Sequence, residues 1–229
     1  MRVLKNTMPK YIDAHCHAKA APTVGAIVNA AQITDWGRVM DLAVDGVFGA
    51  VGVHPWYISG LPTDWLQQLR KTLIDNPDLM VGEIGLDKHK PDMDLQISVF
   101  KGQLLLAHEL GRGVSIHCVG AWEHIAHILK MSQNKLPQFI LAHGYNGPIN
   151  QIQKFADSYN MYFSYGPREI ANPARILETP RNRILAETDS TDPSNIVDVV
   201  NAIADILSVD RTEMADIIYD NTMRMLKHG

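Results

Sequence analysis

The hydrophobic positions of the chain form short apolar runs that alternate with longer stretches of helical spacing. Most runs are apolar nearly throughout rather than at every second position, which is typical of parallel strands covered on both faces. We expect strands at 11–15, 25–30, 47–53, 80–86, 114–118, 139–142, 161–165 and 184–186. A hydrophobic period of about 3.6 residues predicts helices at 63–74, 95–110, 122–129, 148–158, 195–207 and 210–226.

Strands that alternate with helices in this way predict an α/β fold, a TIM-type (β/α)8 barrel, built as one domain over residues 1–229. An open doubly wound sheet would show the same alternation, so the pattern alone leaves both open. The first crossover is unusual, because only residues 18–24 separate His17 from Gly25, and a parallel crossover takes about a dozen residues or more. We expect either that this crossover lacks its helix or that the second strand is not a regular member of the barrel.

Composition and charge exclude several classes of protein. With 46% hydrophobic residues in 229, the bulk of the chain is not disordered, and two cysteines cannot form a disulfide framework. No apolar run reaches the roughly 18 residues of a membrane span, and the first ten residues lack a secretory signal. We therefore expect a cytoplasmic protein with no membrane association and no obligate protein partner. A net charge of -4 argues against a broadly basic nucleic-acid surface, but not against nucleic acid held locally by metal ions.

Polar side chains interrupt the apolar runs at their carboxyl ends. Asp13, His15 and His17 follow a period of two, which places them on one face of a strand. Other strands end in further ligand-type residues, namely His54, Glu83, Asp87, His117, His143 and Asp189. In a parallel barrel all these ends meet at one rim, which carries the active site. Any one of these histidines alone is explained by a structural hydrogen bond, but the whole set predicts a metal site.

Four residues close in sequence to these histidines give a less specific indication of function. Cys16 and Cys118 alternate with the histidines, so we expect them to be buried on the opposite face as small hydrophobic residues rather than zinc ligands. Trp56 and Tyr57 follow a His-Pro pair just past a strand. They either line the pocket and stack on a planar substrate or pack at the rim without contacting it.

Taken in order, these motifs resemble the TatD family of metal-dependent hydrolases, within the wider amidohydrolase-like group. The resemblance spans about residues 11–226 and rests on six short motifs. They are Asp13-Ala-His15-Cys-His17, Gly52-Val-His54-Pro55, Gly82-Glu83-Ile-Gly85-Leu-Asp87, Ile116-His117-Cys118, His143-Gly-Tyr-Asn-Gly147 and Glu187-Thr188-Asp189-Ser190.

The resemblance implies a centre of two divalent metal ions that activates water. One ion would be held by His15, His17, Glu83 and Asp189, and the other by Glu83, His117 and His143, with Glu83 bridging. The implied catalytic residues are Asp189 as general base, Glu83, and His54 facing the reacting group, while Asp13 would orient a ligand histidine. Imidazole ligands make zinc the first expectation, with magnesium or manganese as alternatives.

The chain departs from the family pattern at positions that would read the substrate. Val119 stands where the family commonly has an arginine, a natural bidentate partner for phosphate. Asn146 replaces a serine, Lys88-His89 replaces an aromatic pair, and the proline after Thr-Asp-Ser is displaced to Pro193. Lys88, Arg168 and Arg175 follow strand ends and are candidates to take over phosphate contacts.

The resemblance implies phosphodiester hydrolysis, and together with these departures it leaves three functions open. The first is phosphodiester hydrolysis of the deoxyribonuclease type, with DNA as substrate. The second is hydrolysis of a small phosphate or carboxylic ester, or of an amide, by the same centre. The third is a metal-binding protein without turnover, against which the complete set of ligands argues.

Overall fold

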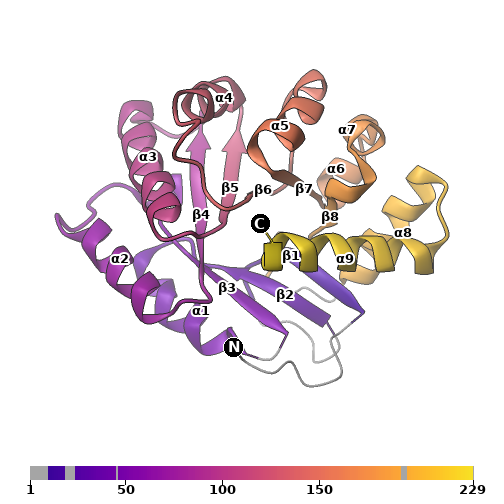
Figure 1. The fold of residues 1–229 in the computed structure, drawn as a ribbon, viewed down its shortest axis with the longest axis horizontal. Coiled ribbons are helices and arrows are strands. Elements are labelled where there is room, and N and C mark those ends of the chain that lie inside the picture. Colours follow the sequence, from indigo (N-terminus) through magenta and orange to yellow (C-terminus); the bar gives the residue numbers. More distant parts are fainter. Residues whose placement is uncertain (1–9, 19–23, 45, 192–194, 229) are drawn as a thin grey trace.

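The computed structural model describes residues 10–18, 24–44, 46–191 and 195–228 of the chain. Its strands are all parallel and pair in sequence order in one sheet, which curls into a nearly closed barrel (Figure 1). They are β1 (Tyr11–Cys16), β2 (Val24–Asn29), β3 (Val47–Val51), β4 (Met80–Asp87), β5 (Val114–Val119), β6 (Ile140–Ala142), β7 (Met161–Tyr165) and β8 (Ile184–Ala186). The predicted TIM-type (β/α)8 barrel is confirmed. The doubly wound alternative is wrong, because no strand departs from sequence order.

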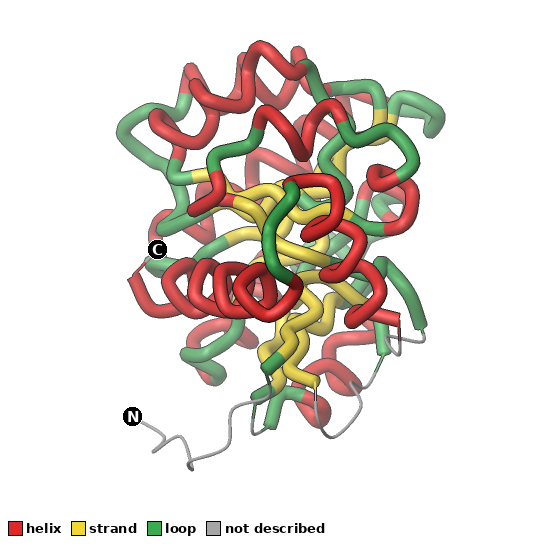
Figure 2. The backbone as a smooth tube through the Cα atoms, turned by 90° about the vertical axis from the view of Figure 1, so that its right-hand side faces the viewer, coloured by secondary structure: helices red, strands yellow, loops and turns green. Residues whose placement is uncertain are grey.

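The helices surround the strands, as the side view in Figure 2 shows. They are α1 (Trp36–Leu42), α2 (Trp65–Asp75), α3 (Met93–Glu109), α4 (Trp122–Met131), α5 (Ile152–Tyr159), α6 (Pro167–Ile170), α7 (Ala174–Glu178), α8 (Ile196–Leu207) and α9 (Arg211–His228). Single turns of 3-10 helix lie at η1 (Ile33–Asp35), η2 (Pro55–Tyr57), η3 (Ile149–Gln151) and η4 (Arg181–Arg183). The sequence pattern did not predict α1, α6 and α7, because seven, four and five residues are too few to display a helical period.

The buried apolar residues form two clusters, one outside the strands of the barrel and one inside it. The larger one fills the layer between strands and helices, where Val28, Val81 and Phe100 are completely buried. The smaller one lies inside the barrel and contains Ala14, Ile27, Ala50, Met80, Phe139, Leu141, Tyr162, Leu185 and Met225. Met225 comes from α9, which crosses the front of the barrel in Figure 1. The interior is therefore packed, and the polar residues that end the strands gather at the other end of the barrel.

The second strand is a regular member of the barrel. β2 pairs in parallel with β1, where Ile12 lies opposite Gly25, and with β3, where Ile27 lies opposite Phe48. Of the two alternatives for this region, the one in which the second strand is not a member of the barrel is therefore wrong. Residues 19–23 of the first crossover lie outside the described residues.

The first and last strands meet through side chains and the residues that follow them. The carboxylate of Asp13 accepts hydrogen bonds from the backbone N–H and the hydroxyl of Thr188, at 3.1 and 2.6 Å. Beyond β8, the backbone N–H of Asp189 donates to the carbonyl of His15 at 3.0 Å, and that of His17 donates to the carbonyl of Ser190 at 3.0 Å. This seam holds Asp189 beside the two histidines of β1.

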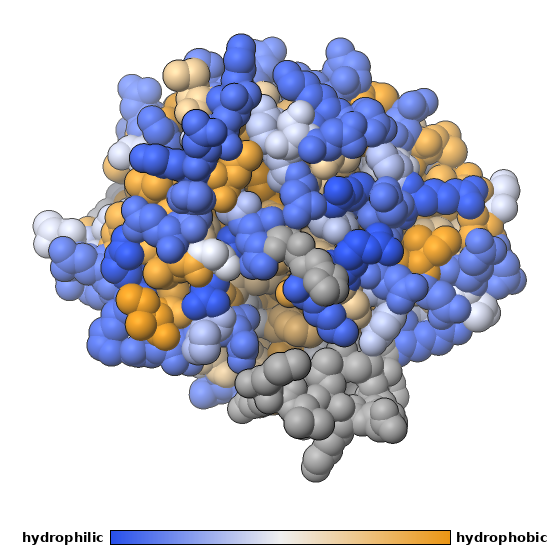
Figure 3. Space-filling model, viewed as in Figure 1, coloured by the Kyte–Doolittle hydropathy of each residue, from blue (hydrophilic) through white to orange (hydrophobic). Residues whose placement is uncertain are grey.

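Hydrophilic side chains cover most of the face shown in Figure 3, with apolar ones in small groups between them. Within the described ranges, none of the helices combines the length and the apolar character that crossing a membrane requires.

Candidate metal centre

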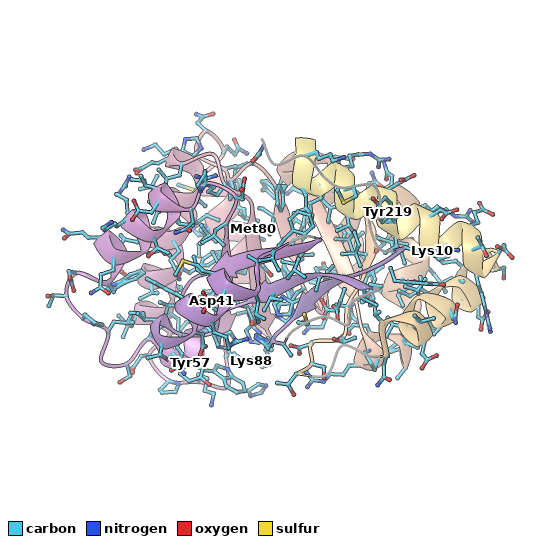
Figure 4. The ribbon with its side chains drawn as sticks, turned by 90° about the horizontal axis from the view of Figure 1, so that it is seen from below. Lys10, Asp41, Tyr57, Met80, Lys88 and Tyr219 are labelled. Atoms are coloured by element: carbon cyan, nitrogen blue, oxygen red, sulfur yellow. The ribbon has the colours of Figure 1, made fainter. Side chains whose placement is uncertain are left out.

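The ligand-type residues of the sequence converge at the carboxyl end of the barrel. In Figure 4 Lys88, just past the end of β4, lies near the lower edge of the molecule, and Met80 at the start of that strand lies nearer the middle. At the Lys88 end the structure brings together His15, His17, His54, Glu83, His117, His143 and Asp189. They come from six of the strands or from the residues just after them, with Glu83 and His117 lying within β4 and β5.

Glu83 lies at the centre of this cluster, and its two carboxylate oxygens face different histidines. Oε2 lies 3.4 Å from Nε2 of His15 and 3.3 Å from Nε2 of His17. Oε1 lies 2.8 Å from Nε2 of His143, 3.0 Å from Nδ1 of His117 and 3.3 Å from Nε2 of His54. One carboxylate thus divides the imidazoles into two groups, which is the arrangement that a ligand bridging two cations requires.

Asp189 joins the group on the Oε2 side. Its Oδ1 atom lies 3.5 Å from Nε2 of His17 and 3.9 Å from Nε2 of His15. Ligand atoms of three residues approach within 4.8 Å of one another in the sets His15–His17–Glu83, His15–His143–Asp189 and His54–Glu83–His117. The distances to Glu83 group the same histidines that the resemblance implies for each ion, with His54 also on the Oε1 side, whereas the set His15–His143–Asp189 spans both groups.

The outward nitrogens of two rings face acceptor oxygens, one in a hydrogen bond and one at ion-pair distance, which leaves the inward nitrogens suited to a cation. Nδ1 of His17 lies 3.1 Å from the carbonyl oxygen of Asn29, and Nδ1 of His143 lies 3.5 Å from Oε1 of Glu187. Carbonyl and carboxylate oxygens only accept, so we assign the proton to Nδ1 in both neutral rings. Their Nε2 lone pairs then face the oxygens of Glu83, a contact that is favourable only with a proton or a metal ion between them.

His54 has the opposite tautomer. Its Nδ1 atom accepts the backbone N–H of Trp56 at 3.1 Å, so the proton of the neutral ring resides on Nε2. That proton points toward Oε1 of Glu83. His54 is therefore arranged as a hydrogen-bond donor rather than as a metal ligand.

Burial and charge act against each other in this cluster. Burial raises the pKa of the Glu83 carboxyl, but the surrounding histidines outweigh it and hold that pKa well below its ordinary value. Burial also lowers the pKa of His143, yet the carboxylates of Glu83 and Glu187 raise it well above the usual value. For His17, Asp189 and Glu83 overcome burial and raise the pKa to about 10. The pKa of Asp189 is lowered to about 2, since the hydrogen bond from His17 and the charges of His15 and His143 outweigh its burial.

For His15 and His54 the balance goes the other way, and burial keeps both rings neutral at neutral pH. Complete burial lowers the pKa of His15, and the neighbouring charge of His143 lowers it further. Burial likewise lowers the pKa of His54. Together these groups form a compact set of nitrogen and oxygen ligand atoms. Its ionised carboxylates favour a positive charge at the centre of the set.

A glycine lets β4 and β5 approach closely beside the site. Gly85 has a φ of +153°, and a Cβ atom there would lie 1.8 Å from the carbonyl oxygen of His117. The β4–β5 register also shifts between Val81 and Ile84, where Glu83 enters the barrel. Any larger residue at position 85 would push β5 away and displace His117 from Glu83.

A cavity of about 180 Å³ opens beside the cluster. Its walls include His117, Val119, Asn146, Arg168, Glu169 and Asp189. Arg168 is 86% exposed and places Nη1 3.7 Å from Oδ2 of Asp189, so one predicted phosphate-binding residue lies at the mouth of this cavity.

Of the other two predicted phosphate-binding residues, Lys88 lies at the rim of the site and Arg175 does not. The stem of Lys88 lies across Gly120, where a Cβ atom would meet the Cδ atom of Lys88 at 2.3 Å, so this lysine leans over the rim next to Val119. Arg175 donates from Nε to the carbonyl of Gly147 at 2.7 Å and lines a separate cavity. Arg175 is therefore not part of this site. Pro193 lies outside the described residues.

Asp13 bonds the ligand residue His15 through the backbone. Its carboxylate accepts the backbone N–H of His15 at 3.1 Å together with the two Thr188 donors, and its hydrogen bonds within the described ranges go to these backbone and hydroxyl groups and not to an imidazole ring. The residue next to the His15 ring is Ser115, whose hydroxyl lies 3.1 Å from Nδ1. Burial raises the pKa of Asp13 to about 7, although the bonds from Thr188 oppose the rise.

Sequence reasoning missed the groups that orient the rings. Ser115 and the carbonyl of Asn29 carry no motif, so nothing in the sequence could have found them. Glu187 stands within the Glu-Thr-Asp motif without a role, although its buried carboxylate accepts from the Ser164 hydroxyl and faces His143. Cys16 and Cys118 are buried in the apolar layer outside the strands.

Comparisons with known proteins agree with this geometry. The family model "TatD related DNase" matches residues 11–227. The metal-dependent hydrolase YabD of Bacillus subtilis, called uncharacterized, is 27% identical over 202 residues, covering 80% of this chain and 78% of its own length. The 3'-5' ssDNA/RNA exonuclease TatD of Pantoea ananatis is 28% identical over 186 residues, covering 76% of this chain and 70% of its own length.

A solved structure shows the same fold. The crystal structure of YJJV, a TatD homolog from Escherichia coli, superposes with a TM-score of 0.85 at 24% identity over 96% of this chain and 98% of its own. The family model, which spans nearly the whole chain, and the buried cluster of histidines and carboxylates lead to one conclusion. The chain belongs to the TatD family of metal-dependent hydrolases.

Proposed function

We propose that the protein is a phosphodiesterase of the deoxyribonuclease type, with two divalent metal ions in the centre around Glu83. The observation that carries the proposal is the division of the histidines between the two oxygens of Glu83. His15, His17 and Asp189 would hold one ion, and His117 and His143 the other, with Glu83 shared. When bound, two such ions act as Lewis acids, orient the phosphate and lower the pKa of water so that it attacks at neutral pH.

The residues of the chain have distinct roles in this reaction. Asp189 is ionised at neutral pH, is partly exposed and lines the cavity, so its carboxylate accepts the proton of the attacking water. His54 presents Nε2–H toward the centre and donates it to an oxygen of the reacting group. Arg168 and Lys88 lie at the rim, where their charges attract the phosphates of the substrate.

Similarity to nucleases supports nucleic acid as the substrate. The Pantoea ananatis relative is named for activity on single-stranded DNA and RNA. We infer that this chain acts on the same class of molecule, and that its fewer phosphate-binding groups around Val119 alter which strands it prefers.

A second candidate is hydrolysis of a small phosphate or carboxylic ester. The observation that favours it is the cavity of about 180 Å³ beside the cluster, which is below the roughly 300–1,000 Å³ of a pocket for a drug-sized ligand. A polymeric substrate would have to extend from this cavity along the rim.

The test begins with metal. Elemental analysis of the purified protein is expected to give about two equivalents of zinc, manganese or magnesium per chain, and fewer in a His15→Ala/His17→Ala double variant. Absence of bound metal, even after reconstitution and dialysis, would contradict the proposal and favour a protein without turnover.

Substrate then separates the candidates. The reconstituted protein is assayed on single-stranded oligonucleotides and on generic phosphate and carboxylic esters, with Asp189→Asn as the inactive control. We expect cleavage of the oligonucleotide from its 3' end, lost in Asp189→Asn. Hydrolysis of the small esters with no cleavage of any oligonucleotide would select the second candidate.

A further inference from the structure

Two aromatic side chains project from the rim beside the proposed metal centre. Trp56 is 51% exposed and Tyr57 is 42% exposed, and both belong to the turn η2 that follows His54. Within the described part of the chain, they are the aromatic members of the exposed large hydrophobic residues; the others are aliphatic. Figure 4 shows Tyr57 at the same edge of the molecule as Lys88, far from Lys10 and Tyr219. An exposed indole at a catalytic rim does not serve the packing of a core.

The indole of Trp56 is held in one position. Its Nε1–H donates to Oδ2 of Asp87 at 2.7 Å, and its backbone N–H donates to Nδ1 of His54. Asp87 is itself buried and accepts the backbone N–H of His89. These contacts fix the ring before any ligand arrives, so binding to it loses little side-chain entropy.

The position of the ring relates it directly to the reacting groups. Its centroid lies 5.3 Å from the centroid of the His54 ring and 6.5 Å from that of His117. The indole is therefore a direct neighbour of two histidines of the cluster. A phosphate bound beside these rings would have its adjoining nucleoside within reach of the indole.

The space and the charge around the Trp56 indole suit a nucleobase that is linked to phosphates. A groove of about 260 Å³ runs between the two aromatic residues and the polar side chains of Gln32, Thr34 and Ser59. The ammonium of Lys90 lies 4.2 Å from the centroid of the Trp56 ring. Aromatic platforms combined with nearby cations are how proteins bind single strands without reading their sequence.

We propose that Trp56, supported by Tyr57, forms a stacking subsite for the base adjoining the scissile phosphate of a single-stranded nucleic acid. This inference rests on the proposed function, because the base can adjoin the scissile phosphate only if that phosphate binds at the centre around Glu83. The subsite explains how a chain of net charge -4 engages nucleic acid, because stacking contributes affinity that basic surface charge would otherwise supply. Bases in a duplex are already stacked on each other, so the subsite selects single strands.

The experiment compares two oligonucleotides that differ in the terminal bases. One is an ordinary single-stranded DNA, and the other carries abasic residues at its last two 3' positions. Dissociation constants are measured by fluorescence anisotropy in an Asp189→Asn background, and kcat and KM are measured in the active enzyme. We expect Trp56→Ala to weaken binding and raise KM for the ordinary strand about tenfold or more, and to change the abasic strand less than about twofold.

Two variants keep the result interpretable. Trp56→Phe retains a stacking ring but loses the hydrogen bond to Asp87, and we expect it to bind the ordinary strand much more tightly than Trp56→Ala. Tyr219→Ala removes an aromatic side chain from α9, on the other edge in Figure 4, and is expected to have no effect. An equal loss on both strands for Trp56→Ala would overturn the proposal, because it would show that the indole acts only by supporting Asp87 and His54.

Failure of the subsite and failure of the proposed function give different results. If the enzyme cleaves single-stranded DNA and Trp56→Ala leaves its dissociation constant and KM unchanged, the stacking subsite is wrong and the phosphodiesterase remains. If the wild-type protein neither binds nor cleaves any oligonucleotide but hydrolyses small esters, both are wrong.

Discussion

Nδ1 of His54 accepts the backbone N–H of Trp56 at 3.1 Å, and this single contact gives His54 a different chemical role from the histidines around it. In their neutral form His17 and His143 have the proton on the outward nitrogen and a lone pair toward Glu83, whereas neutral His54 presents a proton there. Residues of the same type within one cluster are thus divided by their backbone and side-chain partners into ligands and a donor.

The first prediction follows from this division. His54→Ala should retain both metal ions and lose turnover by about 10²–10⁴-fold, the usual contribution of a positioned acid or base. His17→Ala, in contrast, should lose metal from its side of the centre. Elemental analysis together with activity measurement distinguishes the two, and loss of an ion in His54→Ala would show that its tautomer is not the one assigned.

Glu83 is expected to be the residue on which both ions depend. Because each of its oxygens faces a separate group of histidines, Glu83→Ala should reduce metal content from about two equivalents to less than one, while His117→Ala should leave about one. Isothermal titration of the metal-free variants measures the number of sites. A Glu83→Ala protein that still binds a full equivalent tightly would argue against a shared carboxylate.

The pKa of His17, raised to about 10, and that of His143, raised well above its usual value, predict proton release on metal binding. Both rings carry an extra proton at neutral pH in the metal-free protein, and a cation must displace it. Metal affinity should therefore fall as the pH falls below about 10. Calorimetry in buffers of different ionisation enthalpy counts the protons; a value near zero at pH 7 would contradict the expected charge state.

The same shifts govern the stability of the metal-free protein. The contribution of His17 is present below its unfolded pKa of about 6.5 and is lost as the pH rises through about 10. The contribution of Asp189 has the opposite sign, since its pKa is lowered. It is present above the unfolded value of 3.8 and is lost as the pH falls through about 2. Denaturant midpoints across this range measure both.

Ser115 is predicted to control metal affinity through His15. Ser115→Ala removes the hydroxyl beside Nδ1 of that ring, and loss of such a supporting partner lowers metal affinity or activity about 10- to 100-fold. Ser164→Ala is the matched comparison, because its hydroxyl supports Glu187 and therefore the His143 side. In a metal titration the two variants should lower the affinity for different ions. An identical loss of affinity for both ions would indicate a general loss of structure.

Thr188 is predicted to stabilise the seam between β1 and β8. Thr188→Val keeps the shape but removes a hydroxyl that donates to the buried Asp13 carboxylate, which should lower the free energy of unfolding by about 1–3 kcal/mol. Thr222→Val serves as the control, since that buried hydroxyl donates only to the Ile218 carbonyl within its own helix. Chemical denaturation checks the difference, and equal costs would mean that the Asp13 contact has no special weight.

Local sequence patterns suffice to predict the α/β class of the fold and the chemical type of the site. Apolar runs covered on both faces and the helices between them follow from local periodicity, which a strand or helix carries in its own residues. His15 and His17 share a side because strands have a period of two, and Glu83, His117, His143 and Asp189 meet because parallel strands end at one rim.

The arrangement of those residues depends on contacts that form only in the folded chain. Asn29 orients His17 through a backbone carbonyl, which any residue has, and Asp13 contacts Thr188, 175 residues along the chain, instead of a histidine ring. Which oxygen of Glu83 faces which ring depends on the stagger of β4 against its neighbours, where the register shifts between Val81 and Ile84. Such contacts join groups far apart in sequence, and a local pattern records the kind of residue at a position but not the neighbour that the fold gives it.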